Sequence, residues 1–156
     1  MLPLVILLTL VLVLVVRNRV GREIVQRTED ACDDDAARDA LRALRATGRE
    51  LAPSLPPRAA ARALRALRTA DLVERRTGVV GVSVGKGYRI ELCVRGLAPP
   101  ERLHVFLHEL AHAAALSVGH TREHAELERG LRDAAFRAGY DVRSPSIVRC
   151  YPSHTG

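Results

Sequence analysis

The chain opens with an almost unbroken apolar run, and only afterwards do polar residues return at regular intervals. Residues 2–16 contain hardly a polar group, and as a helix they would measure roughly 22 Å. A hydrocarbon core is about 30 Å thick, but Arg17 and Arg19 follow directly and can reach the headgroups. No small-residue cleavage site follows this run. We therefore expect an uncleaved single-pass membrane anchor over residues 1–19, with the rest of the chain facing the cytosol.

Helical spacing governs the next stretch of the chain. Apolar residues within 37–51 recur every three or four positions, which predicts a helix that is ended by the prolines of segment 53–57. A second helix is expected over about 58–76, with a row of arginines on one solvated face.

From Gly78 the pattern changes to strand spacing. Several β-branched valines are followed by the turn Gly85–Gly87, and residues 88–94 then alternate between apolar and polar. This pattern predicts a β-hairpin over residues 79–94 with one half-buried face. The edge of such a hairpin can pair with an extended peptide.

Two further helices follow the hairpin. Pro99 and its neighbour Pro100 favour a first helical turn, and the apolar spacing predicts a helix that runs to about Val118. Gly119 ends this helix, and Thr121 is a suitable N-cap for a last helix that reaches about residue 138. The fold class expected from these elements is α+β, mostly helical with a small β-hairpin or sheet, plus the N-terminal transmembrane helix.

Length and composition limit what this domain can be. The chain has 156 residues, which is enough for one compact domain after the anchor, here residues 20–156. Hydrophobic residues make up 47% and aromatic residues 3%, so the core is built mainly from Leu, Val and Ala. The net charge of +6 comes almost entirely from arginine, and no aromatic residues interleave with the arginines. A nucleic-acid partner is thus possible but unsupported, because there is no stacking platform.

The three cysteines are widely spaced. Cys32, Cys93 and Cys150 form no CxxC pair, and an odd number is a poor disulfide framework. We expect reduced thiols in a reducing compartment, with Cys93 as a small core residue of the second hairpin strand.

One five-residue segment predicts chemistry. His108 and His112 are four residues apart within an apolar helical segment, so both imidazoles project from one face and can bind one metal ion. Glu109 lies next to the first histidine and can reach a metal-activated water without being a ligand. This arrangement predicts a Zn²⁺ site with Glu109 as general base for hydrolysis of a peptide bond.

A catalytic zinc ion needs a third protein ligand. His120 is the first choice, because it follows Gly119, where a left-handed turn can direct the chain back toward the metal. His124 is the alternative third ligand. Glu126 and Glu128 remain as further alternatives, since a carboxylate on the next helix can also serve.

Two other histidines receive no ligand role. His104 lies four residues before His108 and is interpreted as a helix-surface residue, although a place behind the ligands is an alternative. His154, in the tail, is assigned no role.

The segments VSVGKGYRIELCVR, HVFLHELAHAAALSVGHTREH and RAGYDV resemble the WLM-type and SprT-like zincin metallopeptidases. Most similar are the small metallopeptidases encoded by large DNA viruses. The resemblance covers about residues 79–150, and HELAH followed by GHT is its most specific feature. It implies a minimal zincin-like domain with a catalytic core at about 79–140 and His120 as third ligand.

Two positions depart from the pattern of that family. His124 and Ala125 stand where the family has an aromatic pair, and the tail reads Cys-Tyr-Pro instead of Tyr-Cys-Gly. The expected function is a membrane-anchored zinc metallopeptidase that acts on a protein or peptide, with the membrane contacted through residues 2–16. The alternative is a catalytically inactive, membrane-tethered zincin-fold protein with an interaction or structural role.

Overall fold

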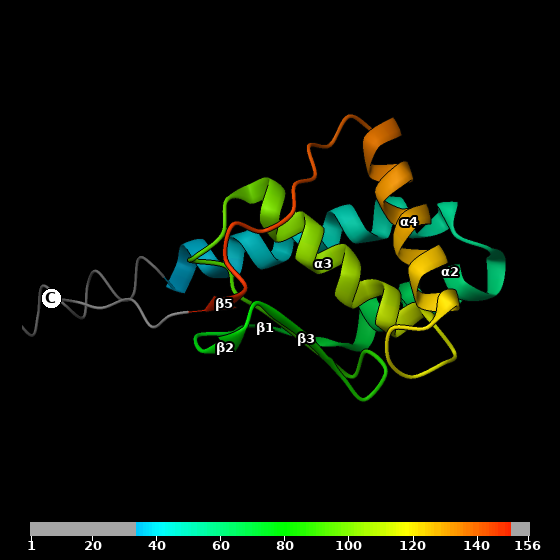
Figure 1. Cartoon of the computed structure of the whole chain (residues 1–156), viewed down its shortest axis with the longest axis horizontal. Coiled ribbons are helices and arrows are strands. Elements are labelled where there is room, and N and C mark those ends of the chain that lie inside the picture. The colour runs from blue at the N-terminus through cyan, green and yellow to red at the C-terminus, as the bar shows by residue number, and fades with distance from the viewer. Residues whose placement is uncertain (1–33, 151–156) are drawn as a thin grey trace, which may run out of the picture. The chain divides into compact units, whose positions relative to one another are not determined.

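A computed structural model describes residues 34–150. These residues form an α+β fold (Figure 1). A helix over residues 34–51 continues into the short 3₁₀ helix η1 (Ala52–Ser54). The remaining elements follow in this order: α2 (Pro57–Thr69), β1 (Asp71–Glu74), β2 (Gly78–Val79), β3 (Gly81–Val84), β4 (Arg89–Leu92), α3 (Pro99–Ala114), α4 (Arg122–Arg137) and β5 (Arg149–Cys150).

The fold prediction is wrong in its transmembrane helix. Within residues 34–150, no helix is both long enough and apolar enough to cross a membrane. The predicted single-pass location, with a membrane contact through residues 2–16, is therefore not supported and is withdrawn. The stretch 1–19, on which that prediction was placed, lies outside the described residues.

The main sheet has the strand order β1-β4-β3. The predicted hairpin is confirmed, because β3 and β4 pair antiparallel around the turn Gly85–Gly87. Strand β1 was not expected: α2 ends at Thr69, and the chain then runs parallel to β4. Hydrogen bonds from Asp71 N to Tyr88 O (3.1 Å) and from Arg75 N to Leu92 O (2.7 Å) hold it there. These partners lie 17 residues further along the chain, so local spacing contains no sign of them.

Helix α3 lies at the centre of the described residues and contacts α2, α4 and strands β3 and β4 (Figure 1). Its side chains Phe106, Leu107, Leu110 and Ala111 are fully buried. A helix that is apolar around most of its circumference must be packed on several sides. The surrounding elements therefore fix the position of α3, and with it the HELAH segment.

The sequence predicted where the connection between α3 and α4 ends, but not where it begins. Helix α3 ends at Ala114, one turn before the expected Val118. Helix α4 begins as predicted: Thr121 is the N-cap, and its side-chain oxygen accepts a hydrogen bond from His124 N at 3.3 Å. Residues 115–121 between the helices belong to neither helix nor strand.

The prediction of reduced thiols is wrong for two of the cysteines. Cys93 and Cys150 form a disulfide, with their Cα atoms 5.7 Å apart. Cys93 is also buried, as expected for a core residue. The bond attaches strand β5, which pairs antiparallel with β2, to the end of β4. Cys32 lies outside the described residues.

Candidate metal centre

Helix α3 presents two imidazoles on one face. The ring centroids of His108 and His112 are 4.9 Å apart, as their spacing of about one turn requires. Burial, reinforced by the neighbouring imidazoles, lowers the pKa of His112 to about 4. This imidazole is therefore neutral near pH 7 and keeps a lone pair for a metal ion.

The loop after α3 brings a third imidazole to this pair. The Nε2 atom of His120 lies 2.9 Å from Nε2 of His108, and its ring centroid lies 4.8 Å from that of His112. Gly119 has a φ of 82°, the left-handed conformation that glycine favours. This turn directs the chain back toward α3, so the first-choice third ligand does lie beside the HELAH histidines.

Helix α4 contributes a fourth imidazole. His124 is only 2% exposed, and its ring centroid lies 4.7 Å from that of His108 and 3.9 Å from that of His112. Ligand atoms of these three side chains all lie within 4.8 Å of one another, close enough to bind one metal ion. The Nε2 atom of His124 also lies 3.2 Å from the carbonyl oxygen of His108. Both candidates for the third ligand are thus present, and the choice between them stays a prediction.

A carboxylate from α4 lies behind the first ligand. Glu128 Oε2 is 3.1 Å from Nδ1 of His108 and 3.9 Å from Nδ1 of His124. The hydrogen bond with His108 lowers the pKa of Glu128 to about 2 and raises the pKa of His108. With Nδ1 held in this way, Nε2 of His108 is the nitrogen left for a metal ion.

Glu128 is itself held in place by a second side chain, in addition to His108. Arg132 forms an ion pair with Glu128 and lies 2.8 Å from Nε2 of His104, so His104 belongs to a network behind the ligands and not to the imidazole cluster. The sequence offered Glu128 only as an alternative ligand. The signal available was the i, i+4 spacing of His124, Glu128 and Arg132 on one helix face.

The candidate base is a buried carboxyl group. Glu109 is 5% exposed, and burial raises its pKa to about 7 against the lowering effects of His108 and of a hydrogen bond from the backbone N–H of Ser83. Strand β3 can approach so closely because it begins with glycine. A Cβ on Gly81 would lie 2.8 Å from Oε1 of Glu109 and 2.5 Å from Cγ1 of Val105. Sequence reasoning missed Gly81, although a glycine at a strand position is a known sign of close approach.

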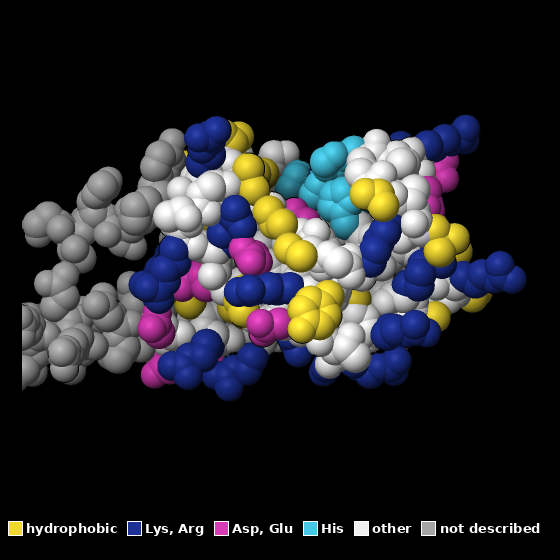
Figure 2. Space-filling model, turned by 90° about the horizontal axis from the view of Figure 1, so that it is seen from below, with side chains coloured by type: hydrophobic (Ala, Val, Ile, Leu, Met, Phe, Trp, Pro, Cys, Tyr) yellow, Lys and Arg dark blue, Asp and Glu magenta, His cyan; other side chains and the backbone are white. Residues whose placement is uncertain are grey.

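A cleft of about 640 Å³ separates α3 and the following loop from strand β3. His108, Glu109, His112 and His120 line it, whereas His124 does not. Figure 2 shows histidine side chains gathered on this face, with hydrophobic side chains beside them. The strand side is lined by the following residues: Val79, Gly81, Val82, Ser83, Gly85 and Lys86.

Among the described residues, strand β3 presents a free edge, because β4 is its only partner in the sheet. Cys93 N donates to Val80 O at 2.8 Å, so the backbone groups of Val80 point toward β4. Successive residues of an antiparallel strand alternate in this respect, which directs the backbone groups of Gly81 and Ser83 away from β4. Both residues line the cleft. An extended chain could therefore pair with β3 next to the imidazoles.

The remaining predicted ligands lie elsewhere. Glu126 is exposed on α4 and forms an ion pair with Arg122 at 2.7 Å. His154 is outside the described residues. The donor set that remains, imidazole nitrogens with an orienting carboxylate, fits a divalent transition metal better than Ca²⁺ or Mg²⁺, which prefer oxygen ligands. No protein-family model, curated protein or solved structure matches this chain, so the likeness to WLM-type and SprT-like proteins stays a prediction.

Proposed function

We propose that this protein is a zinc-dependent metallopeptidase in which His108, His112 and His120 hold the metal ion and Glu109 is the general base. The observation that carries the proposal is the cleft itself. Three imidazoles and a buried carboxylate line one wall, and the other wall is a strand with a free edge. This combination suits a site where an extended peptide is cleaved.

The choice of His120 over His124 follows from access. His120 lines the cleft with the two α3 histidines, whereas His124 is buried behind them and its Nε2 faces a backbone carbonyl. Three imidazole ligands on one side leave a position open toward the cleft, as in catalytic zinc sites. When bound, zinc acts as a Lewis acid that polarises the peptide carbonyl and makes water more acidic.

The side chain of Glu109 moves the proton. Its pKa of about 7 arises from burial, and a nearby cation would lower that pKa, because it favours the carboxylate. As the carboxylate, Glu109 accepts a proton from the water that attacks the carbonyl carbon. It then returns that proton to the amine nitrogen as the C–N bond breaks. The hydrogen bond from Ser83 N–H keeps the carboxylate facing β3, where the substrate backbone would lie.

The test compares Glu109→Gln with the wild type. The variant should keep one zinc ion per chain, measured by elemental analysis, and lose hydrolysis of an unfolded protein by at least about 100-fold. Glu126→Gln is the matched control, because it removes a carboxylate from the exposed face of α4, outside the cleft. Loss of zinc in the Glu109 variant, or retained hydrolysis, would contradict the role of Glu109.

A non-catalytic function is the second candidate, and His124 favours it. Its ring lies as close to His108 and His112 as the ring of His120 does. Four imidazole ligands would close the coordination sphere, as structural zinc sites do. The visible spectrum of the Co²⁺-substituted protein separates the two candidates. Addition of a small anion should change it if a position is open and leave it unchanged if four protein ligands surround the metal.

A further inference from the structure

Beyond Ala115, which is buried where α3 ends, the loop that carries His120 lacks an apolar anchor. Leu116 is 73% exposed and Val118 is 83% exposed, so neither side chain holds residues 116–121 against the core. Gly119 adds conformational freedom beside the histidine. The position of His120 must therefore depend on polar contacts of the loop backbone.

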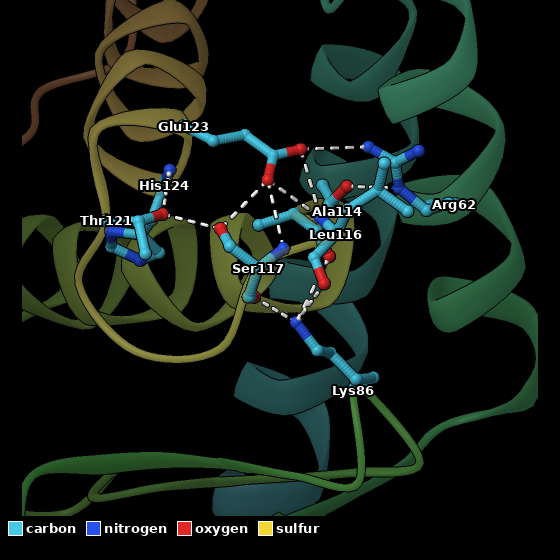
Figure 3. Close-up of polar contacts among 9 residues, drawn as sticks. Arg62, Lys86, Ala114, Leu116, Ser117, Thr121, Glu123 and His124 are labelled. Atoms are coloured by element: carbon cyan, nitrogen blue, oxygen red, sulfur yellow. Dashed lines mark hydrogen bonds and ion pairs between the residues drawn. The ribbon is translucent and has the colours of Figure 1, made fainter.

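Two charged side chains form hydrogen bonds with that backbone from opposite sides (Figure 3). Glu123 accepts hydrogen bonds from the N–H groups of Leu116 and Ser117, both at 3.0 Å. Lys86 donates to the carbonyl oxygens of Leu116, at 2.9 Å, and of Ser117, and lies 3.4 Å from that of Ala115. Glu123 follows the loop in sequence, but Lys86 reaches it from the tip of the β3–β4 hairpin, about 30 residues away.

The hairpin tip holds Lys86 in an unusual conformation. Its φ is 57°, between Gly85 and Gly87, which also have positive φ. Glycine is the residue that such a position favours, so a lysine here indicates a role for the side chain. Lys86 is the only lysine among 24 basic residues. A compact ammonium group with three rotatable donors suits three adjacent carbonyl oxygens better than the planar fork of arginine does.

Lys86 also separates two cavities. It lines the 640 Å³ cleft together with the imidazoles, and it lines a second cavity of about 360 Å³ against α2. Because its ammonium group bonds to the loop on the opposite wall, its side chain bridges the two walls of the metal cleft near the hairpin turn.

We propose that Lys86 is a positioning residue for the metal centre: it ties the hairpin turn to residues 115–117 and so holds His120 beside His108 and His112. This inference rests on the proposed metal site with His120 as a ligand. The tie acts through the loop, since within residues 34–150 the ammonium group of Lys86 donates to loop carbonyls and to no histidine.

The sign of the effect on metal affinity tests the proposal. Removal of a positive charge near a cation site should by itself strengthen cation binding. If Lys86 positions the loop, Lys86→Met should instead weaken Zn²⁺ binding about tenfold, measured by competition with a chromophoric chelator. Arg89→Met is the matched control: it removes one positive charge from the same hairpin, where Arg89 pairs with Glu91. Equal or tighter binding in the Lys86 variant would overturn the proposal.

A second variant separates positioning from plain stability. Lys86→Gly places the favoured residue at this φ, so the thermal midpoint of the metal-free protein should stay close to that of the wild type while Zn²⁺ affinity falls. Lys86→Arg should give an intermediate affinity, because the charge remains but the fork fits the carbonyls less well. If both variants bind zinc like the wild type, the position of the third ligand does not depend on the contacts of Lys86 with the loop, and the proposal fails.

Amide hydrogen exchange of residues 115–120 in the metal-free protein gives a readout that does not depend on the metal. Exchange should speed up in Lys86→Gly and Lys86→Met and remain unchanged in Arg89→Met. If exchange speeds up in these variants but the wild-type protein binds no zinc, the contact between Lys86 and the loop is supported and the metal site is disproved. Unchanged exchange would disprove the tie whether or not zinc binds.

Discussion

The two ends of helix α3 are held in different ways. At the N-terminus, Glu101 accepts from Ala98 N at 2.8 Å and from Ser146 N at 2.7 Å, so one side chain of the first turn caps its own helix and meets the tail. At the C-terminus the helix and the loop beyond it contact Arg62 of α2, Lys86 of the hairpin turn and Glu123 of α4.

This difference separates a structural end from a functional end. At the N-terminus both contacts are made by the side chain of Glu101, seven residues before His108, the first imidazole of the cluster. The contacts at the C-terminus come from three elements and converge on the segment between His112 and His120. Stability of the helix should therefore depend on both ends, whereas metal affinity should depend on the C-terminal end alone.

The largest effect on metal binding outside the ligands is expected for Glu123→Gln. The carboxylate accepts hydrogen bonds from Leu116 N, Ser117 N and Ser117 Oγ, and these bonds lower its pKa to about 2. Loss of the charge should weaken Zn²⁺ binding about 10-fold to 100-fold in chelator competition. Glu126→Gln on the same helix controls for the charge. An unchanged affinity would show that the C-terminal contacts are as structural as the N-terminal ones.

A change in β3, beside the middle of α3, tests how much the close packing of the strand against the helix contributes to stability. Gly81→Ala would press a methyl group against Val105 and Glu109, and should lower the free energy of unfolding by about 1–3 kcal/mol. Urea denaturation measures this value. Gly130→Ala is the control, because a Cβ there meets only Leu55 at 3.4 Å and alanine favours a helix. A neutral result for Gly81→Ala would mean that β3 moves away from the helix without cost.

A smaller effect is expected for Arg62→Met. The Arg62 guanidinium donates to the carbonyl oxygen of Ala114 and lies 3.4 Å from Oε1 of Glu123, with its side chain 26% exposed. Its loss should lower the free energy of unfolding by about 1–2 kcal/mol, since a helix-end carbonyl loses its donor. Metal affinity should fall less than in Glu123→Gln, because Arg62 has no hydrogen bond with residues 115–120. Arg65→Met, on the exposed side of α2, should change neither quantity.

The smallest effect is expected at the N-terminal end. Hydrogen bonds from Ser146 and from Ala98 N lower the pKa of Glu101. A carboxyl group with a lowered pKa in the folded state stabilises the protein above its unfolded pKa of about 4, and this contribution is lost as the pH falls through the folded pKa. Glu101→Gln should thus lower the melting temperature slightly at pH 7, with the difference shrinking as the pH falls below about 4. Zn²⁺ affinity should not change, and a loss comparable to that of Glu123→Gln would remove the distinction between the ends.

The same two ends show what a sequence can predict. Pro99 and Pro100 start α3 where the spacing predicted, because a helix start depends on residues within one turn. The predicted end at Val118 was one turn too late, since apolar residues continue past Ala114 and the contacts that end the helix come from distant residues. Strand β1 was missed for the same reason, as its partner lies in β4.

The candidate site follows this pattern too. His108, Glu109 and His112 are predictable from spacing because a helix fixes their relation. His120 lies beside His108, and the local signal for it was the glycine before it, whereas its role as a ligand stays a prediction. The roles of Gly81, Lys86 and Glu128 depend on which strand, turn or helix face packs against α3. Only the folded structure contains that information.

The solitary lysine makes the hairpin tip chemically unique. Apart from the chain's own amino terminus, Lys86 offers the only primary amine for acylating reagents in the sequence. Its reactivity should therefore report directly on one contact: slow labelling while the ammonium group is held by the loop carbonyls, and fast labelling once the loop releases it. The mass increment on the peptide that carries Lys86 would then follow the state of the cleft wall in the wild-type protein, without a mutation or a bound substrate.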